Sequence, residues 1–423
     1  MLDIRFIRDN RDLVIKRLAI KNFNHPELVD EVFGLDQERK RLQAESDATQ
    51  SKLNTASREI GQLMAAGQKE EAEGKKHLVA TLKSFLQPIA ENLKQTEERL
   101  REKILLLPNI PSLAVPPGRS PEENVVMREG GEQPRLPQGA LPHWDLAKKY
   151  QLIDFEIGNK ISGSGFPMYV HRGAKLQRAL IQYFLDFNIA NGYTEYEPPI
   201  LVNEQSAFGT TQLPDKEGQM YFVGEDKLFL IPTAEVPLTN VYRDMIVSEQ
   251  ELPIRMTAYT PCFRREAGSY GKDVRGLNRL HQFDKVELVQ LVRPDESYDT
   301  LEEMVNHVEK LLLTLELPYR ILKLCGGDMS FSSALTYDFE VYSAAQEKWL
   351  EVSSVTNFET FQTSRMKIRF RDGENKIQLV HSLNGSSLAL PRIVACLLEN
   401  HQREKDIRLP LPLHPYFGAT HIS

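Results

Sequence analysis

Apolar residues near the start of the chain recur at alternating spacings of three and four. One run spans Leu35–Leu63, and a second resumes at Val79 and ends at Leu107, beyond Gly67 and Gly74. Heptad-like spacing of this kind is typical of helices that pack along a seam. The pattern therefore predicts two long helices, joined by a glycine-bearing turn and folded into an antiparallel α-helical coiled-coil hairpin.

The seam of this hairpin is imperfect, because Arg39, Ser46 and Lys103 occupy core-type positions. Pro88 falls inside the second helix, where a proline is expected to kink it. Acidic and basic residues nearly balance along the arm. The pattern alone thus leaves two interpretations open: a spacer or dimerisation coil, and an arm that binds nucleic acid.

A proline-dense segment follows the hairpin, from Pro108 to Pro121. Such composition is typical of a stiff connector between domains. We therefore expect an N-terminal domain over residues 1–107, a proline-rich linker over 108–130 and a second domain over 131–423.

Helical and alternating segments mix beyond the linker. A helical pattern near Lys175–Asn191 ends at Gly192, and a final helix is predicted from Ser387 to His401. Strand-like segments are Tyr193–Val202, Lys227–Ile231, Tyr259–Arg265, Arg279–Val292, Leu335–Ser343 and Trp349–Thr356. Because hairpins rather than β-α-β crossovers connect them, the pattern favours an α+β fold with a largely antiparallel sheet flanked by helices.

Candidate chemistry concentrates in one predicted hairpin, formed by Phe263–Glu266 and Arg279–Glu287. Period-two alternation would place Arg264 and Glu266 on one face of the first strand. On the second strand, the residues that would share a face are Arg279, His281, Phe283 and Glu287. Guanidiniums, carboxylates and an aromatic plane together suit a triphosphate, an adenine and a small zwitterion. The alternative is an amphipathic hairpin with a salt-bridged outer face, which leaves the aromatic ring facing water.

The connection between these strands holds Gly268, Gly271 and Gly276, so a long mobile loop is expected. Neither G-x-x-x-x-G-K-[ST] nor G-x-G-x-x-G occurs in the sequence. If ATP binds, it binds through side chains and not through a glycine-rich phosphate loop. We expect Arg264 to contact the α-phosphate and Arg392, in the last helix, to contact the far phosphates.

Composition narrows the class of protein further. The formal net charge of the 423 residues is −7, so a nucleic-acid partner would need a local basic surface. No stretch approaches the roughly 20 apolar residues that cross a bilayer, and no secretory signal opens the chain. Cys262, Cys325 and Cys396 form no C-x-x-C pair, which fits a reducing compartment such as the cytoplasm.

Three short motifs occur in an order that resembles the class II aminoacyl-tRNA synthetases. They are Gly192-Tyr193-x-x-Tyr196-x-x-Pro199, Phe263-Arg264-x-Glu266 with Arg279-x-x-x-Phe283, and Gly385-Ser386-x-Leu388-Ala389 leading to Arg392. Each motif alone recurs by chance, but the ordered set is specific. Within this class, the chain resembles the bacterial-type seryl-tRNA synthetases over essentially its whole length, through the N-terminal hairpin, Thr233-Ala234-Glu235 and Glu351-Val352-Ser353-Ser354.

The resemblance implies a set of site residues. Those implied for serine binding are Thr233, Ala234, Glu235, Glu287 and Ser386. Those implied for ATP binding are Arg264, Arg265, Glu266, Leu280, Phe283, Glu351, Val352, Ser353, Ser354 and Arg392. Glu351 and Ser354 would also hold Mg²⁺ with the ATP, and Arg264 and Arg392 would act in catalysis.

Each of these roles has a structural alternative. Thr233 could cap a helix over Val236–Val247, Phe283 could be a core aromatic, and Glu351 or Arg392 could simply face solvent. Residues three apart in a regular strand face opposite ways. Glu351 and Ser354 can therefore share an ion only across a bulge or at a strand end.

The resemblance also implies an activity and its partners. ATP and L-serine would form seryl-adenylate, and the acyl group would pass to tRNA(Ser) and also to tRNA(Sec), in a cytoplasmic homodimer. The serine carboxylate is itself the nucleophile, so no protein base is needed. The helical hairpin would embrace the long variable arm of the tRNA, with candidate contacts at Arg39, Lys40, Arg41, Lys52, Arg58, Lys75, Lys76 and Lys83.

Three other functions can be considered for the whole chain. A related ligase that loads an amino acid onto a carrier protein would be expected to lack a full-length arm. An inactive paralogue that only binds tRNA would be expected to lack part of the set Arg264, Glu266, Glu287, Glu351 and Arg392, yet all five are present. A coiled-coil scaffold with an incidental globular tail would need none of these residues.

Overall fold

The computed structural model describes residues 1–215, 218–267 and 275–423. The chain divides into two units. One comprises Met1–Ala19 with Phe23–Ile110, and the other comprises Ile20–Asn22 with Pro111–Ser423. Most of the predicted glycine-bearing loop, including Gly268 and Gly271, lies outside the described residues. Among the helices that are described, none is long and apolar enough to span a bilayer.

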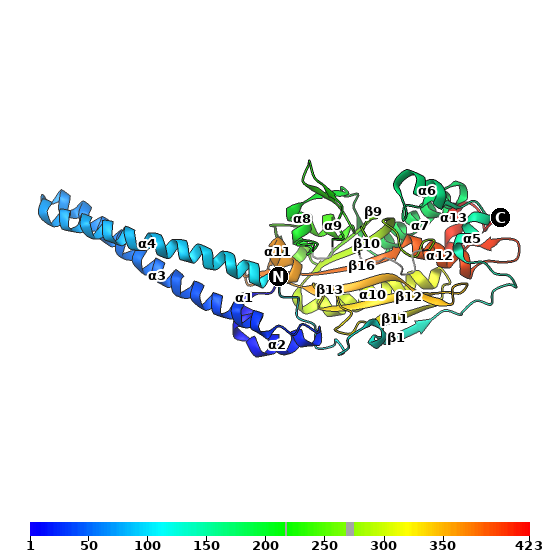
Figure 1. The fold of residues 1–423 in the computed structure, drawn as a ribbon, viewed down its shortest axis with the longest axis horizontal. Helices are drawn as coiled ribbons and strands as arrows, with labels where there is room; N and C mark the ends of the chain where they lie inside the picture. Colours follow the sequence, from blue (N-terminus) through cyan, green and yellow to red (C-terminus); the bar gives the residue numbers. More distant parts are fainter. Residues whose placement is uncertain (216–217, 268–274) are drawn as a thin grey trace. The chain divides into compact units, whose positions relative to one another are not determined.

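The first unit is helical. Its elements are α1 (Ile4–Asp9), α2 (Arg11–Ile20), α3 (Pro26–Ala65) and α4 (Lys69–Ile104). The helices α3 and α4 lie side by side as an antiparallel hairpin, which confirms the predicted arm (Figure 1). Gly67, with φ +79°, reverses the chain between them, where a side chain would be strained.

The arm differs from prediction in the start of its second helix. Helix α4 begins at Lys69, so Gly74 lies inside it and not in the turn. The same helix continues without interruption past Pro88. Both residues are tolerated because the helix is stabilised mainly by packing along its neighbour, which outweighs a local propensity cost. The polar seam residue Arg39 is accommodated by hydrogen bonds to the buried Asp36.

The second unit is built on an eight-stranded sheet with the order β1-β11-β12-β13-β16-β10-β9-β4. In that order the strands are Val125–Gly130, Tyr319–Lys323, Leu335–Ser343, Lys348–Glu359, His381–Ala389, Gln282–Val292, Ile254–Phe263 and Thr194–Glu195. Neighbouring strands are antiparallel except the short β4, which pairs with β9 in parallel. The predicted α+β class with a mainly antiparallel sheet is confirmed.

One face of this sheet is covered by three helices, α7 (His171–Ala190), α10 (Ser297–Thr314) and α12 (Leu390–Asn400). Their apolar side chains form the main core with strand residues such as Val286, Leu288, Phe339 and Val355. Because strand side chains alternate, the intervening residues of the same strands point to the opposite face. Those residues include most of the predicted polar groups.

Shorter elements surround the sheet. The remaining helices are α5 (His143–Lys149), α6 (Phe155–Ser162), α8 (Glu204–Gly209), α9 (Glu235–Asn240), α11 (Phe361–Met366) and α13 (His414–Phe417). The remaining strands are β2 (Ile153–Asp154), β3 (Met168–Tyr169), β5 (Leu201–Asn203), β6 (Phe222–Val223), β7 (Leu228–Leu230), β8 (Ile246–Ser248), β14 (Arg369–Arg371), β15 (Ile377–Leu379), β17 (Ile407–Arg408) and β18 (His421–Ile422).

Two predicted elements beyond the linker were wrong in extent. The segment Tyr193–Val202 is two short strands, β4 and β5, because Pro198 and Pro199 cannot donate to a ladder. The last predicted helix starts at Leu390 and not at Ser387, which belongs to β16. The third motif is therefore mostly a central strand, and its backbone is held by pairing with β10.

The hairpin that carries the second motif is also shorter than predicted. Strand β9 ends at Phe263 and β10 begins at Gln282, so Arg264 and Glu266 lie beyond the first strand. Glu266 has φ +49°, which turns the backbone out of the extended conformation. The prediction that Arg264 and Glu266 share a strand face is therefore wrong, although both remain beside the hairpin.

Candidate active site

The face of the sheet that the three helices leave uncovered is rich in polar groups. Strand β10 contributes Lys285 and Glu287, and Glu287 lies opposite Ser386 of β16 in the ladder. Further along the same face, Ser354 of β13 lies opposite Asp338 of β12. Serine and glutamate residues that are far apart in sequence are thus brought onto one surface by strand pairing alone.

A buried ion pair forms the centre of this face. The Glu287 side chain is 1% exposed, and its Oε2 accepts from Lys285 Nζ at 2.5 Å and from Thr233 Oγ1 at 3.1 Å. Burial raises the pKa of Glu287, against the opposing effects of Lys285, Thr233 and, at longer range, Arg264. The cluster can therefore bind a group that brings additional positive charge.

A second buried carboxylate, Glu235, lies at the start of α9. Its Oε1 accepts from Gln362 Nε2 at 2.6 Å, and its Oε2 accepts from Asn384 Nδ2 at 2.7 Å. Burial, followed by repulsion from Glu287, raises the pKa of Glu235 to about 7. Two carboxylates are thus buried close to the ammonium of Lys285.

The structure places the other predicted serine-binding residues around this pair. Thr233 is not the residue that caps α9, since Ala234 precedes the helix, but its Oγ1 also accepts from the Glu235 backbone N–H at 3.2 Å. The predicted helix over Val236–Val247 ends instead at Asn240. Ala234 is fully buried in an apolar cluster, so only its backbone can face a ligand.

Arg264 lies at the end of β9, next to the aromatic ring of Phe283. The guanidinium carbon is 5.2 Å from the ring centroid, and Nε donates to Pro232 O at 3.4 Å. Close by in sequence, Glu266 and Arg279 form an ion pair at 3.2 Å. The second motif therefore presents a cation over an aromatic face, an arrangement that a planar base can join by stacking.

Arg392 lies in the first turn of α12 and contacts two other segments. Its Nη1 donates to the backbone oxygen of Glu351 at 2.6 Å and lies 3.7 Å from the Glu351 carboxylate. Its Nε donates to Asn278 O at 3.1 Å. Arg392 and Glu351, predicted from separate motifs, are thus direct neighbours.

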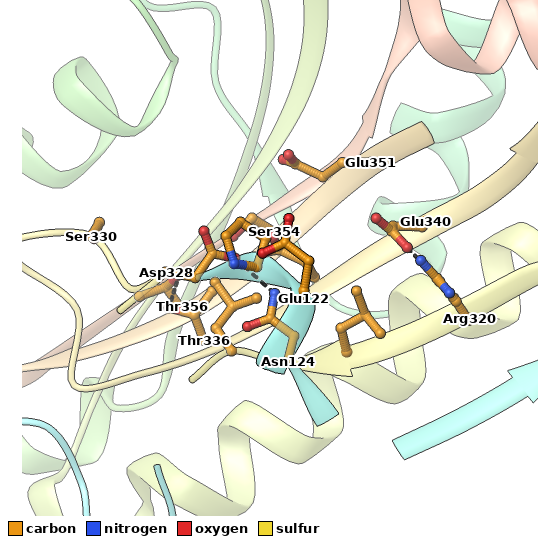
Figure 2. Close-up of a pocket in the computed structure, with 14 residues that line it drawn as sticks. Glu122, Asn124, Arg320, Asp328, Ser330, Thr336, Glu340, Glu351, Ser354 and Thr356 are labelled. Atoms are coloured by element: carbon orange, nitrogen blue, oxygen red, sulfur yellow. Dashed lines mark hydrogen bonds and ion pairs between the residues drawn. The ribbon is translucent and has the colours of Figure 1, made fainter. Parts of the chain in front are cut away.

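The predicted bulge at Glu351 is confirmed. Ser353 lies opposite Phe339 while Glu351 lies opposite Glu340, so Val352 is an extra residue in β13. As a result, both Glu351 and Ser354 line a cavity of about 550 Å³ (Figure 2). Its other acidic lining residues are Glu122, Asp328, Asp338 and Glu340.

The remaining residues predicted to bind ATP differ in the burial and contacts of their side chains. Val352 packs into the main core, and Ser353 donates from its hydroxyl to Ser386 O at 2.6 Å. Arg265 is exposed and Leu280 is buried. A ligand could reach the backbone of these buried residues more readily than their side chains.

Several polar residues of the face were missed in the sequence. Lys285 could have been found from period-two alternation, because it shares a face with Glu287. Asn384 could have been found in the same way from Ser386. Gln362, from α11, gives no local signal, since only the fold brings it to Glu235. Asp338 has a buried Oδ1 with no hydrogen-bond partner among the described residues.

Comparison with known proteins adds independent evidence. Residues 1–111 match the seryl-tRNA synthetase N-terminal domain, and residues 222–401 match the tRNA synthetase class II core domain (G, H, P, S and T). The serine–tRNA ligase of Salinibacter ruber is 49% identical over 100% of this chain and 99% of its own length. That of Methylacidiphilum infernorum is 46% identical over the full length of both proteins.

A solved structure is similar over the same extent. The crystal structure of seryl-tRNA synthetase from Pyrococcus horikoshii, complexed with ATP, has a TM-score of 0.93 and 32% identity, and the match covers 100% of this chain and 99% of that one. Similarity of this degree spans both the helical hairpin and the sheet with its polar face. The chain therefore belongs to the seryl-tRNA synthetases, the class II enzymes that ligate serine to tRNA.

Proposed function

We propose that this chain activates L-serine with ATP on the polar face of its sheet, and transfers the serine to tRNA(Ser) and tRNA(Sec). The observation that carries the proposal is the buried cluster of Glu235, Glu287, Lys285 and Thr233, which lies on the same sheet face as Phe283. A pocket for a small zwitterion and a platform for a base would then be neighbours along strand β10.

The proposed serine pocket contains more buried carboxylates than ammonium groups. Glu287 and Glu235 are both buried, and Lys285 supplies one ammonium between them. A buried carboxylate without a full counter-charge is costly, so the site favours a ligand that brings its own ammonium. Thr233 and Ser386 add hydroxyl groups within the same ladder and loop, which suit the hydroxymethyl group of serine.

The proposed ATP site is formed by residues of the second and third motifs. Phe283 already carries the guanidinium of Arg264 over its ring, and an adenine can use the same aromatic surface. Arg392, next to Glu351, provides a second guanidinium from α12. Recognition of ATP by the Pyrococcus horikoshii relative supports the same ligand here.

Activation requires positioning and charge stabilisation and no protein base. The serine carboxylate attacks the α-phosphorus, pyrophosphate leaves, and seryl-adenylate remains bound. Arg264 would stabilise the charge that grows on the α-phosphate. A ribose hydroxyl at the 3′ end of the tRNA then attacks the acyl carbon, the ester forms, and AMP leaves.

Glu351 and Ser354 are the residues that we propose to hold Mg²⁺. Hard cations prefer oxygen ligands, and Mg²⁺ is commonly held by one or two protein groups together with phosphate oxygens. Among the described residues no set of three His, Cys, Asp or Glu side chains is arranged to hold a metal, which fits an ion that arrives with the nucleotide. When bound, Mg²⁺ neutralises phosphate charge.

The helical hairpin α3–α4 would bind the variable arm of the tRNA by shape and backbone contacts. The structure separates the predicted arm cations into two groups. Ion pairs at 4.0 Å or less involve Arg39, Lys40, Arg41, Lys75 and Lys76. Within the described chain, Lys52, Arg58 and Lys83 are exposed and form no salt bridge, so they are the better candidates for phosphate contacts.

Two further proposals follow from the family. Its members act in protein synthesis, so we place the enzyme in the cytoplasm. We also propose a homodimer, in which the arm of one subunit serves tRNA at the other. Sedimentation equilibrium with and without tRNA tests this assembly, and a monomer at assay concentrations would contradict it.

The proposed chemistry is tested by substituting Arg264. Arg264→Ala should reduce serine-dependent ATP–pyrophosphate exchange by roughly a hundred- to a thousandfold, since a preorganised donor to developing charge is lost. Arg403→Ala, at an exposed arginine, is the matched control. Exchange by the Arg264 variant at a rate near that of the wild type would refute the assignment.

A further inference from the structure

Residues 275–280, a short segment just before β10, contact Arg392. The backbone oxygen of Asn278 accepts from Arg392 Nε at 3.1 Å. The same segment carries Arg279, which pairs with Glu266, and Leu280. Residues 275–280 therefore share with Glu351 the contacts that set where the Arg392 guanidinium lies.

This segment is itself anchored to a buried histidine. The backbone N–H of Leu277 donates to His143 Nε2 at 2.9 Å. The other ring nitrogen, Nδ1, lies 2.7 Å from Glu399 Oε1, and neither side chain is exposed. Because Nε2 accepts a hydrogen bond, the ring proton must sit on Nδ1 and face the carboxylate.

Glu399 is held rigidly on α12. Its Oε1 also accepts from the His143 backbone N–H at 2.9 Å and from Gln346 Nε2 at 2.9 Å, and its Oε2 accepts from Ser343 Oγ. Burial favours the neutral acid, but the hydrogen bonds from His143 and Ser343 outweigh it and hold the pKa of Glu399 below its ordinary value. A charged and fully bonded carboxylate fixes the imidazole ring.

Two further contacts press the segment against the same histidine. Gly276 has φ +68°, and a Cβ there would come within 2.2 Å of His143 Nε2. Only glycine allows the backbone this close. The guanidinium of Arg275 lies 4.6 Å from the ring centroid of Trp144, the residue after His143.

A second anchor runs through Gln346, at the turn between β12 and β13. Its Oε1 accepts from Asn278 Nδ2 at 3.0 Å while its Nε2 donates to Glu399. The backbone of Leu277 and the side chain of Asn278 are thus linked, through His143 and Gln346 respectively, to one buried carboxylate. Neither His143 nor Glu399 nor Gln346 belongs to the three motifs.

We propose that His143, oriented by Glu399, is a positioning residue that acts through the backbone of Leu277 and Asn278 to hold Arg392 for ATP. This role rests on the proposed function, since it needs Arg392 to bind ATP. A residue that only stabilises the fold would affect both substrates. A residue that positions Arg392 should affect ATP and leave serine unchanged.

Two substitutions at His143 test the roles of its two ring nitrogens separately. His143→Asn keeps a donor near Glu399 and removes the acceptor for Leu277. His143→Gln keeps an acceptor that can reach Leu277 and removes the donor to Glu399, whose oxygens keep three other hydrogen bonds. We expect His143→Asn to weaken ATP binding roughly five- to a hundredfold, as for a buried N–H left without a partner, with His143→Gln much closer to wild type.

The measurements are calorimetric ATP dissociation constants and the KM for serine in pyrophosphate exchange, on the full-length protein. In an Arg392→Ala background, His143→Asn should cause no further loss of ATP affinity, because both changes remove the same interaction. Should His143→Asn fail to fold, Gln346→Ala at the half-buried second anchor should give the same pattern.

The outcomes distinguish a failure of the proposed ATP site from a failure of the positioning role alone. If Arg392→Ala leaves ATP affinity unchanged, the proposed nucleotide site fails, and the positioning role fails with it. If Arg392→Ala weakens ATP binding while His143→Asn and Gln346→Ala do not, only the positioning role is overturned. Equal losses for ATP and serine, or losses that add fully to that of Arg392→Ala, would also overturn it.

Discussion

At the scale of single residues, the site depends on an unequal number of buried charges. Glu235 and Glu287 are both buried, whereas Lys285 is the one cation, among the described residues, that forms an ion pair with Glu287. Burial, followed by repulsion from Glu287, raises the pKa of Glu235 to about 7. This shift gives the site a pH dependence that can be measured.

We predict that serine affinity falls as the pH is lowered through about 7. Above that value Glu235 is ionised and attracts the serine ammonium, whereas below it the carboxyl is protonated and the attraction is lost. The KM for serine, measured by pyrophosphate exchange at saturating ATP, should therefore rise on the acid side. Glu235→Gln should bind serine weakly at every pH, while Glu404→Gln, at an exposed position, should behave like wild type. A serine KM that is flat across this range in the wild type would contradict the role of Glu235.

Breaking the central ion pair should be costly. Lys285→Met leaves Glu287 buried without its cation, and the loss of one partner of a buried pair typically destabilises a protein by about 3–5 kcal/mol. Urea unfolding of the second unit measures this. The double variant Lys285→Met with Glu287→Gln should recover part of the loss, since it also removes the unpaired charge. A change of stability below about 1 kcal/mol in the single variant would show that the pair is dispensable.

Sequence patterns identified the candidate residues that belong to a single short motif. Arg264, Phe283, Glu287, Glu351 and Arg392 stand in short recognisable contexts, and the structure brings Arg392 to Glu351 and Arg264 to Phe283. The missed residues act on partners far along the chain. The hydrogen bonds between Gln362 and Glu235 and between His143 and Leu277 join residues that only the fold brings together. No spacing in the sequence predicts such contacts.

At the scale of elements, long periodic segments were predicted well and short ones poorly. The hairpin α3–α4, helix α7 and strands β10, β12 and β13 each bury one face over many residues, which leaves a clear period in the sequence. The last helix was predicted to begin at Ser387 and not at Leu390, because the inner strand β16 lies between β10 and β13 and mixes apolar and small residues. The glycine of that strand, Gly385, faces Met304 and Val355, so it permits close packing against α10 and not approach of a phosphate.

The arm provides a prediction at this scale. A triple variant of the exposed cations Lys52, Arg58 and Lys83 to Ala should weaken tRNA binding, and the slope of log affinity against log salt should fall by about 0.7–0.9 for each phosphate that is no longer neutralised. A matched triple variant of the ion-paired Arg41, Lys75 and Lys76 to Ala should have a smaller effect. Neither should change pyrophosphate exchange. Equal salt slopes for both triple variants and the wild type would rule out this binding surface.

At the scale of the whole molecule, the two units are expected to divide the reaction. We expect adenylate formation to use only residues of the second unit and tRNA selection to need the arm. At the base of the hairpin Lys103 Nζ lies 3.0 Å from Glu31, so a short glycine linker can replace the arm without stretching the chain. We predict that replacing Leu35–Leu107 in this way preserves serine-dependent exchange and abolishes aminoacylation of tRNA(Ser). Normal aminoacylation by the shortened protein would assign the arm another role.

Residue patterns alone could not settle the role of the arm. The net charge of −7 indicates no overall basic surface, and the heptad-like spacing suits a spacer as well as an arm that binds tRNA. The match of residues 1–111 to the seryl-tRNA synthetase N-terminal domain shows the family of this domain, and tRNA binding by the arm stays a prediction.

The central claim is that one face of the antiparallel sheet binds ATP and serine side by side, and that the buried carboxylates Glu235 and Glu287 select the serine. It is tested most directly by ATP–pyrophosphate exchange with each proteinogenic amino acid in turn, on the full-length enzyme with Mg²⁺. We predict strong exchange with serine, and with the other amino acids only exchange that is far weaker at equal concentration. Exchange that is equally strong with another amino acid, or no exchange with serine, would contradict the account.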